Sequence, residues 1–516
     1  MIVKNKKNSY GGKVIGSGSY GCTFKPPLRC NNSNTIYNGI SKLLENNEAD
    51  DEWKELMRAK NIVKNIPNSN NYFLLNNLEK CRPNKLTDND LENIKNCEIP
   101  LRNINISNIN NNLDKLQIIN MQDGGNTISN VIRGNSFNFY IINKLLINLL
   151  INAIIPMNNL HLYHNDIKGD NLLYNNNAVK IIDWGLASVN LTNNLFNKAL
   201  SFNNPLSKVL FSTRYLNEYL NIIFNKYPNI NKNTPNLFYI LYKLMKPYYS
   251  FFMNNVSKGH TEYISIILNK IFKQANKNMS NNYIEKLLED IIASHCAKIF
   301  MTYLNFETRI FNIELFFYNV YSKNLDVYGL IMSYIDLLFI PPVINNLMDR
   351  YVNILIKYCF SIEFADKPID INNLVSDLQS LTNENGLAGS IPINLNILLK
   401  HIEVKNNKIM KVVKPKSVMV NQKSNLLKKE NINLSNKFNK KKHIKKHTKK
   451  HTKKHTKKHT KKHTKKHTKK HTKKYCPPGT RKKYYCESRR KLYKYKYKKY
   501  CPAGTKKIGY CRNIKY

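Results

Sequence analysis

Two short apolar runs, Leu172–Tyr174 and Val179–Ile182, are joined by an asparagine-rich turn, and this pattern predicts a β-hairpin. Polar side chains stand at both ends of the hairpin. Asp166 and Asn171 precede its first strand, and Asp183 follows its second strand. Because the two open ends of a hairpin lie side by side, we expect these three side chains to lie close together. Carboxylate and amide oxygens are ligands for hard cations such as Mg²⁺.

The remaining pattern divides residues 1–385 into a part with strands and a part with helices. Apolar residues recur at helical spacing where helices are predicted and alternate or cluster in short runs where strands are predicted. Residues 76–113 are rich in Asn, show no clear period and are expected to form loops. The predicted strands are 13–24 (broken by a glycine turn) and 40–44, and within 116–125 a further strand runs into a polar turn. The predicted helical segments are 48–66, 137–160, 207–320 and 349–381.

Charge separates the C-terminal segment from this part of the chain. The formal net charge of the 516 residues is +48, and residues 441–516 alone carry 32 Lys and Arg against one acid, Glu487. We therefore expect residues 386–440 to be a linker and residues 441–474, a Lys-Lys-His-Thr repeat, to be disordered, because such a repeat has no side chains for a core.

The last segment, residues 475–516, contains the spacing Cys-Pro-x-Gly-Thr-x5-Cys twice and a Lys/Tyr-rich stretch between the two copies. Cys476, Cys486, Cys501 and Cys511 could form small disulfide loops, bind zinc or remain thiols. Lysines with interleaved aromatic rings suit nucleic acid, because the charge neutralises phosphates and the rings stack on bases. We expect this tail to bind nucleic acid or another polyanion.

The other cysteines (22, 30, 81, 97, 296 and 359) are scattered, as in proteins of a reducing cytosol. The N-terminus has no apolar core and predicts no signal peptide. Polar residues interrupt the longest apolar runs, so we expect no membrane span.

The hairpin and its flanks resemble the protein kinase signature, in which H-R-D-x-K-x-x-N is followed by D-F-G. Here the matching residues are His164, Asp166, Lys168 and Asn171, followed by Asp183 and Gly185. Upstream, Gly16-Ser17-Gly18-Ser19-Tyr20-Gly21 resembles the kinase G-x-G-x-x-G loop. The resemblance covers residues 10–385 and implies an α+β class, two-lobed fold, with a small β-rich lobe and a larger helical lobe.

The resemblance also implies a role for each matching residue, with ATP and Mg²⁺ as cofactors. Residues 16–21 would cover the phosphates, and Lys42 would pair with the α- and β-phosphates. Glu52 is the best candidate for orienting Lys42, and Glu48 and Glu55 remain alternatives. Adenine would lie near the gatekeeper Ile119 and the backbone of residues 120–122, including Met121. Asn171 and Asp183 would bind Mg²⁺, Asp166 would orient the acceptor hydroxyl, and Lys168 would steady the γ-phosphate, as in Ser/Thr kinases.

Several positions depart from the kinase pattern. Trp184 replaces Phe, Asn165 replaces Arg, and no A-P-E follows, although residues 203–207 could substitute for it. Residues 207–320 would then be an insertion. Asp326 lies in N-L-D-V-Y-G-L, which resembles the D-V-W-S-x-G of the central helix in kinases, whose aspartate holds the loop with the catalytic Asp.

Together with the Asn/Lys/Ile-rich composition, these departures resemble the divergent Ser/Thr kinases of giant DNA viruses (the mimivirus-like group). That source implies a location in the host cytoplasm at the viral factory, or in the virion, and Ser or Thr of proteins as substrates. The missing A-P-E leaves a second possibility open, a pseudokinase scaffold. In a third, the chain is a particle-associated nucleic-acid-binding protein.

Overall fold

The computed structural model describes residues 12–18, 21–31, 38–134, 137–175, 178–190, 201–256, 258–275, 279–340, 345–382, 392–395, 506–507 and 511–512. The chain divides into two units, Met1–Met410 and Lys411–Tyr516. In the second unit the described residues are β13 (Lys506–Lys507) and β14 (Cys511–Arg512), which pair antiparallel. The predicted linker (except residues 392–395), the Lys-Lys-His-Thr repeat and the rest of the tail lie outside the described residues.

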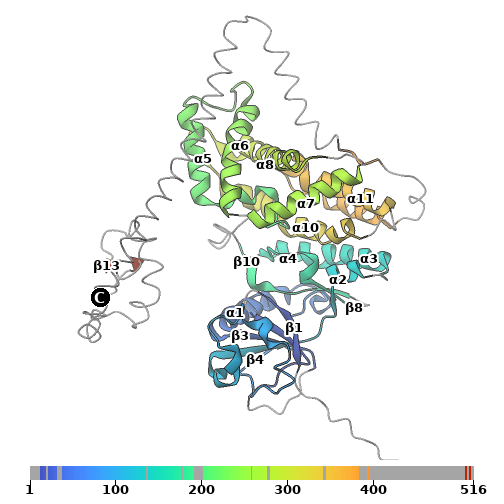
Figure 1. Ribbon diagram of the computed structural model, residues 1–516. Helices are drawn as coiled ribbons and strands as arrows, with labels where there is room; N and C mark the ends of the chain where they lie inside the picture. Colours follow the sequence, from blue (N-terminus) through green and yellow to red (C-terminus); the bar gives the residue numbers. More distant parts are fainter. Residues whose placement is uncertain are drawn as a thin grey trace, which may run out of the picture. The chain divides into compact units, whose positions relative to one another are not determined.

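The first unit has a β-rich N-terminal part and a helical C-terminal part, so its class is α+β (Figure 1). Five antiparallel strands form the N-terminal sheet in the order β1-β2-β3-β5-β4. The strands predicted at 13–24 and 40–44 are confirmed, as is the strand predicted to open the segment 116–125. The bounds are β1 Lys13–Ser17, β2 Gly21–Lys25, β3 Ile40–Glu45, β4 Glu79–Cys81 and β5 Leu116–Met121.

One long helix, α1 (Asn46–Val63), follows β3 directly. Its buried positions are Ala49, Leu56, Ala59 and Val63, which recur at helical spacing and form the face that packs into the core. The prediction of a helix at 48–66 is therefore confirmed, with its end three residues earlier. Burial of this face fixes which side chains of α1 point toward the sheet.

Residues 76–113 are more ordered than their sequence predicts. Besides β4 they form the short helices η2 (Ile94–Cys97) and η3 (Ile106–Asn111), and η4 (Leu113–Lys115) follows directly. Their buried apolar side chains join Val14, Phe24 and Ile118 of the sheet in a second core. The expectation of loops is confirmed for most of this segment, which β4 and the short turns interrupt. Turns of three to six residues leave no periodic signal, so the sequence did not show that they pack on the sheet.

Four of the scattered cysteines form two disulfides in this part, Cys22–Cys97 and Cys30–Cys81. The scattered spacing predicted free cysteines, as in proteins of a reducing cytosol. For these four cysteines that prediction was wrong. The partners are 75 and 51 residues apart in sequence, so only the tertiary structure brings them together. Cys296 and Cys359 are buried free thiols.

A nearly continuous helix begins the helical part, as predicted for residues 137–160. It consists of α3 (Phe139–Leu149), the π-helical turn η5 (Leu150–Ile154) and α4 (Ile155–Asn159). Phe139–Asn159 is long and apolar enough to cross a membrane by length and composition alone. Here Asn143 donates to the Leu378 carbonyl at 2.8 Å and accepts from the Tyr334 hydroxyl at 2.9 Å. The helix thus packs within the core of the first unit.

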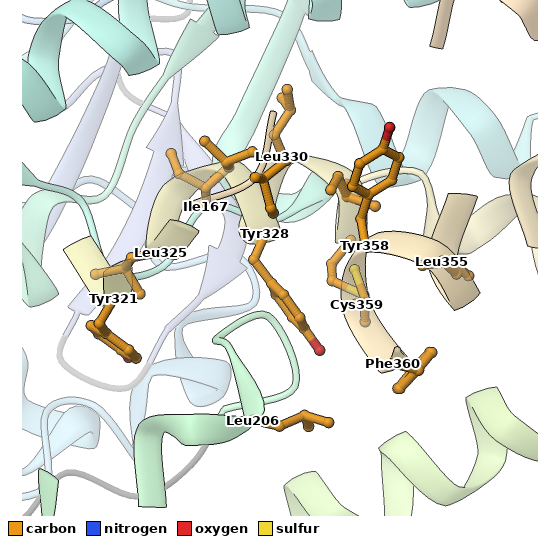
Figure 2. Packing of buried hydrophobic residues seen from close by; sticks show 14 of the residues in the cluster. Ile167, Leu206, Tyr321, Leu325, Tyr328, Leu330, Leu355, Tyr358, Cys359 and Phe360 are labelled. Atoms are coloured by element: carbon orange, nitrogen blue, oxygen red, sulfur yellow. The ribbon is translucent and has the colours of Figure 1, made fainter. Parts of the chain in front are cut away.

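Helix α10 (Ser322–Met332) lies at the centre of the helical part, and Lys323 is its one residue that is not buried. A Cβ at Gly329 would lie 2.6 Å from the Ile167 carbonyl oxygen, so glycine permits the close approach of the 164–171 loop to α10. Tyr328 extends from α10 toward Leu206 (Figure 2). Helix α10 therefore contacts the 164–171 loop, and its Tyr328 faces the segment that begins at Leu206.

The remaining helices complete this part, and α6 packs against α8. The predicted helical character of residues 207–320 and 349–381 is confirmed for the residues that the structure describes. Their bounds are α2 Ile128–Arg133, η8 Leu206–Phe211, α5 Thr213–Lys226, α6 Leu237–Val256, α7 Lys258–Gln274, α8 Asn281–Tyr303, α9 Ile313–Phe316, η9 Phe317–Tyr321, η10 Ile335–Leu338, α11 Asn345–Leu355, η11 Ile356–Phe360, η12 Ile362–Phe364 and α12 Ile371–Ser380, with a small β11–β12 hairpin at Leu304–Asn305 and Ile310–Phe311.

Candidate functional site

The predicted hairpin is present as β8 (Leu172–Asn175) and β9 (Ala178–Ile181), with β6 (Asn126–Thr127) alongside β8. Leu172 pairs with Ile181 at the open end of the hairpin. Asn171 and Asp183 are therefore brought to the same end, and the Ile182 amide donates to the Asn171 carbonyl at 3.1 Å. This is the juxtaposition that the sequence predicted.

A buried carboxylate holds the loop before the hairpin. Asp326 of α10 accepts the backbone N–H of His164 at 2.8 Å and that of Asn165 at 2.9 Å. Asn165 has a positive φ of 64°, and its side-chain amide donates to the Leu186 carbonyl and the Ser188 hydroxyl, both at 2.9 Å. Asp326 thus fixes the backbone of the loop, and Asn165 ties the loop to the segment after Asp183.

The carboxylate of Asp166 is almost fully buried and surrounded by donors. Lys168 Nζ lies 2.8 Å and Asn171 Nδ2 2.9 Å from its Oδ2, and Asn203 Nδ2 lies 2.9 Å from its Oδ1. A carboxylate held in this way can orient a hydroxyl group and accept its proton.

Asp183 is exposed, in contrast to Asp166, and has a left-handed backbone with φ 64°. The next residue, Trp184, is buried against the rings of His164 and Phe73, at centroid distances of 4.9 and 5.9 Å. His164 in turn shares a hydrogen bond with the Ile182 carbonyl at 2.9 Å. Burial of the indole anchors the turn, so that the Asp183 carboxylate projects where a ligand can reach it.

A lysine–glutamate pair joins β3 to α1. Lys42 Nζ lies 2.8 and 2.7 Å from the two carboxylate oxygens of Glu52. Burial lowers the pKa of Lys42, but the charges of Glu52 and Asp183 outweigh burial and leave that pKa above its usual range. The lysine is therefore charged at neutral pH and lies within the electrostatic reach of Asp183. Of the alternatives to Glu52, Glu55 pairs with Arg58 at 3.0 Å.

The glycine-rich turn lies between β1 and β2. The Gly18 amide donates to the Gly21 carbonyl at 2.9 Å, and Ser17 Oγ donates to the Asn96 carbonyl at 2.8 Å. A Cβ at Gly21 would lie 2.7 Å from the Leu43 carbonyl oxygen, so this glycine lets the hairpin lie close over β3. Gly16 pairs with Thr23, whereas Ser19 and Tyr20 lie outside the described residues.

The strand β5 places the remaining predicted residues beside Lys42. Ile119 pairs with Lys42 across the sheet and is fully buried, and Met121 at the end of β5 is half-buried. Asn120 does not face outward, because its side chain is buried and accepts a hydrogen bond from Ser41. The backbone at the end of β5 is therefore the part of this strand that a ligand could meet.

Asn203 is a site residue whose contact sequence reasoning missed. Residues 203–207 were named as a possible substitute for the A-P-E motif, and Asn203 donates to Asp166 and to the Ile167 carbonyl, at 2.9 and 3.0 Å. Its neighbour Asn204 donates to the Asn165 carbonyl at 3.0 Å. One asparagine among many in this chain carries no distinguishing signal, so sequence alone could not single it out.

The donor set at the open end of the hairpin fits a hard cation. The side-chain nitrogen of Asn171 is engaged with Asp166, so its amide oxygen is the atom left for a ligand, and Asp183 adds a carboxylate. Oxygen ligands of this kind, few in number, are typical of Mg²⁺ sites completed by water and substrate phosphates. Among the described residues no group of three or more His, Cys, Asp or Glu side chains could hold a metal by itself.

No protein-family model matches the chain, and no curated protein matches it.

Proposed function

We propose that this protein is an ATP-dependent protein kinase acting on Ser or Thr, with a two-lobed kinase-like fold. One observation carries the proposal. The buried Asp166, with its lysine and asparagine partners, lies in the loop beside Asp183, and Asp183 lies within the electrostatic reach of the Lys42–Glu52 pair. Phosphoryl transfer needs these groups together: a carboxylate for the acceptor hydroxyl, oxygen ligands for the cation and a lysine for phosphates.

Each residue then has a task in the transfer. Lys42, oriented by Glu52, pairs with the α- and β-phosphates, and the Gly16–Gly21 turn covers them. Asp166 accepts a hydrogen bond from the acceptor hydroxyl and takes its proton as the new bond to the γ-phosphorus forms. The bond between this phosphorus and the bridging oxygen to the β-phosphate breaks, and ADP leaves. Lys168 stabilises charge on the γ-phosphoryl oxygens, and the backbone of residues 120–122 meets adenine. Positioning and electrostatic stabilisation carry most of the catalysis in this class of reaction.

Mg²⁺ would be held by Asn171 and Asp183, and it would neutralise charge on the phosphates when bound. Asp326 and Asn165 act at a distance from the reacting atoms. They hold the backbone of residues 164–165 and thereby keep Asp166 oriented. Asn165, in the place of the usual arginine, offers no guanidinium for a phosphorylated residue, so we propose activity without phosphorylation of the segment after Asp183.

Transfer of labelled phosphate from ATP tests the proposal. The full chain is incubated with Mg²⁺ and ATP labelled at the γ-phosphate, with casein as an acidic acceptor and histone as a basic one. Asp166→Asn should abolish labelling and leave nucleotide binding in place, and Asp183→Ala should abolish labelling and weaken nucleotide binding in Mg²⁺. The exposed Asp88→Asn serves as the matched control. Nucleotide binding by the wild-type chain without any labelling would instead identify a pseudokinase scaffold.

A second function is proposed for the C-terminal segment, because residues 441–516 hold 32 of the 82 Lys and Arg with one acid among them. This segment would bind nucleic acid or another polyanion without sequence preference. We also propose a location at a viral factory in the host cytoplasm or in the virion, which the resemblance to the kinases of giant DNA viruses implies. The salt dependence of binding, described in the Discussion, tests this function separately from the kinase activity.

A further inference from the structure

Helix α7 lies beside the loop that contains Asp166, although 92 residues separate His260 of α7 from Lys168 in the sequence. Lys168 and Asp166 both act electrostatically on the His260 imidazole. One turn further along α7, Tyr263 lies within the electrostatic reach of Asp170 of the same loop. Two successive turns of α7 therefore face the loop from outside.

Ring contacts fix α7 in this position. Phe202 packs against His260 at a centroid distance of 6.4 Å in a stacked geometry, and against Tyr263 at 4.8 Å edge to face. Phe202 directly precedes Asn203, whose amide is bound to Asp166. Two adjacent residues, Phe202 and Asn203, thus link α7 to the Asp166 carboxylate, and they hold the helix close to it.

The face of α7 toward the loop differs from its core face. Ile264, Ile267 and Leu268 are buried in the core, whereas His260 is exposed and Tyr263 is half-buried. Desolvation and the positive charge of Lys168 lower the pKa of His260, so the imidazole is uncharged at neutral pH. The face of α7 toward the loop therefore presents two rings, with the charged groups of Lys168 and Asp170 beside them.

We propose that α7 forms one wall of the acceptor site and that His260 contacts the protein segment that presents its hydroxyl to Asp166. The inference rests on the proposed kinase function and adds the substrate class. The ring surface favours an extended segment with an apolar or aromatic side chain beside the Ser or Thr, because such side chains pack on rings. His260 is a specificity residue in this role and takes no part in proton transfer.

Steady-state kinetics with peptides test the proposal. Two Ser-containing peptides are compared that differ by Phe or Ala next to the serine, with the full-length wild type and the variants His260→Ala and His260→Phe. Ile266→Ala is the matched control, since Ile266 is exposed on the same helix and lies outside the ring contacts. The KM for ATP is measured in parallel, because a change confined to the acceptor site leaves it unaltered.

We expect His260→Ala to raise the KM for the Phe peptide about fivefold, which is the size of effect that the loss of one aromatic contact produces. The KM for ATP and the KM for the Ala peptide should stay constant. His260→Phe should retain the preference, because it keeps a ring, and Ile266→Ala should match the wild type. Equal KM values for the Phe peptide in wild type and His260→Ala would overturn this inference but not the proposed kinase function. A wild-type chain that labels no acceptor would instead remove the kinase function on which the inference rests.

Discussion

The carboxylate of Asp326 accepts the backbone N–H of Asn165 at 2.9 Å, across 161 residues of sequence. Its other oxygen accepts the N–H of His164, so one fully buried side chain binds two successive amides of the loop that holds Asp166. Burial raises the pKa of Asp326, and the two amide hydrogen bonds counteract part of that effect. The loop conformation is therefore determined by a residue of the central helix α10.

Asp326→Asn should lower both stability and activity. The amide keeps one acceptor oxygen but turns an NH₂ group toward the second backbone N–H, so a buried donor is left without an acceptor. Hydrogen bonds to a charged group contribute about 1.5–3 kcal/mol each, and we expect a loss of about 2 kcal/mol in the free energy of unfolding. Urea titration measures the loss, with the exposed Asp88→Asn as control; equal midpoints in both variants would contradict the role of Asp326.

Lys42→Met should lower kcat/KM for ATP by about a hundredfold or more, because it removes a preorganised charge at the phosphates. Glu52→Gln should have a smaller effect in the same direction, since it weakens only the orientation of Lys42. The raised pKa of Lys42 means that its charge is present throughout neutral pH and is lost only above the usual range for lysine. Titration of Lys42 should therefore cause no change in the KM for ATP between about pH 7 and pH 9. A pH titration of nucleotide affinity checks this point.

Asn203→Asp should reduce activity more than Asn203→Ala. The aspartate would place a second carboxylate in hydrogen-bonding range of Asp166, where repulsion between like charges disfavours the ionised form that accepts the proton. The alanine variant removes one donor and leaves Lys168 and Asn171 in place. We expect kcat to fall at least about tenfold in Asn203→Asp. The exposed Asn233→Asp is the control, and an Asn203→Asp variant as active as this control would count against the contact.

The two disulfides should stabilise the N-terminal part under oxidising conditions. They close loops of 75 and 51 residues, and restriction of the unfolded chain by a loop of either size corresponds to about 4 kcal/mol. A reducing agent should therefore lower the melting temperature of the wild type. A variant with Ser at positions 22, 30, 81 and 97 should melt lower and be insensitive to the agent. Wild-type melting that is the same with and without reductant would contradict the pairing.

Deletion of residues 441–516 should abolish most nucleic-acid binding and leave phosphorylation of a small peptide unchanged. Binding through Lys and Arg releases counterions, so the logarithm of affinity should fall linearly with the logarithm of salt concentration for the full chain. Fluorescence anisotropy with single-stranded DNA of two unrelated sequences measures the slope. A truncated protein with the same affinity and the same slope would assign the binding to residues 1–440 instead.

Local pattern was sufficient for the elements that hold the predicted site. The β8–β9 hairpin, the glycine-rich turn between β1 and β2, and helix α1 each follow from periodicity and turn residues within a short stretch of sequence. The hairpin in turn places Asn171 and Asp183 at one end, because antiparallel pairing leaves no other arrangement. The resemblance to kinases pointed to Lys42 and favoured Glu52 over Glu48 and Glu55, and the structure pairs Lys42 with Glu52.

Contacts between distant segments depended on the tertiary structure. The short turns of residues 94–115 carry no periodic signal, and the disulfide partners were not apparent, because both depend on how the chain packs on the sheet. The same holds for Asn203 on Asp166 and for His260 beside Lys168. Each of these side chains is ordinary in its local sequence. Burial, shape complementarity with α10 and the ring contacts of α7 decide which of many asparagines and histidines lies at the site, and these are properties of the folded chain.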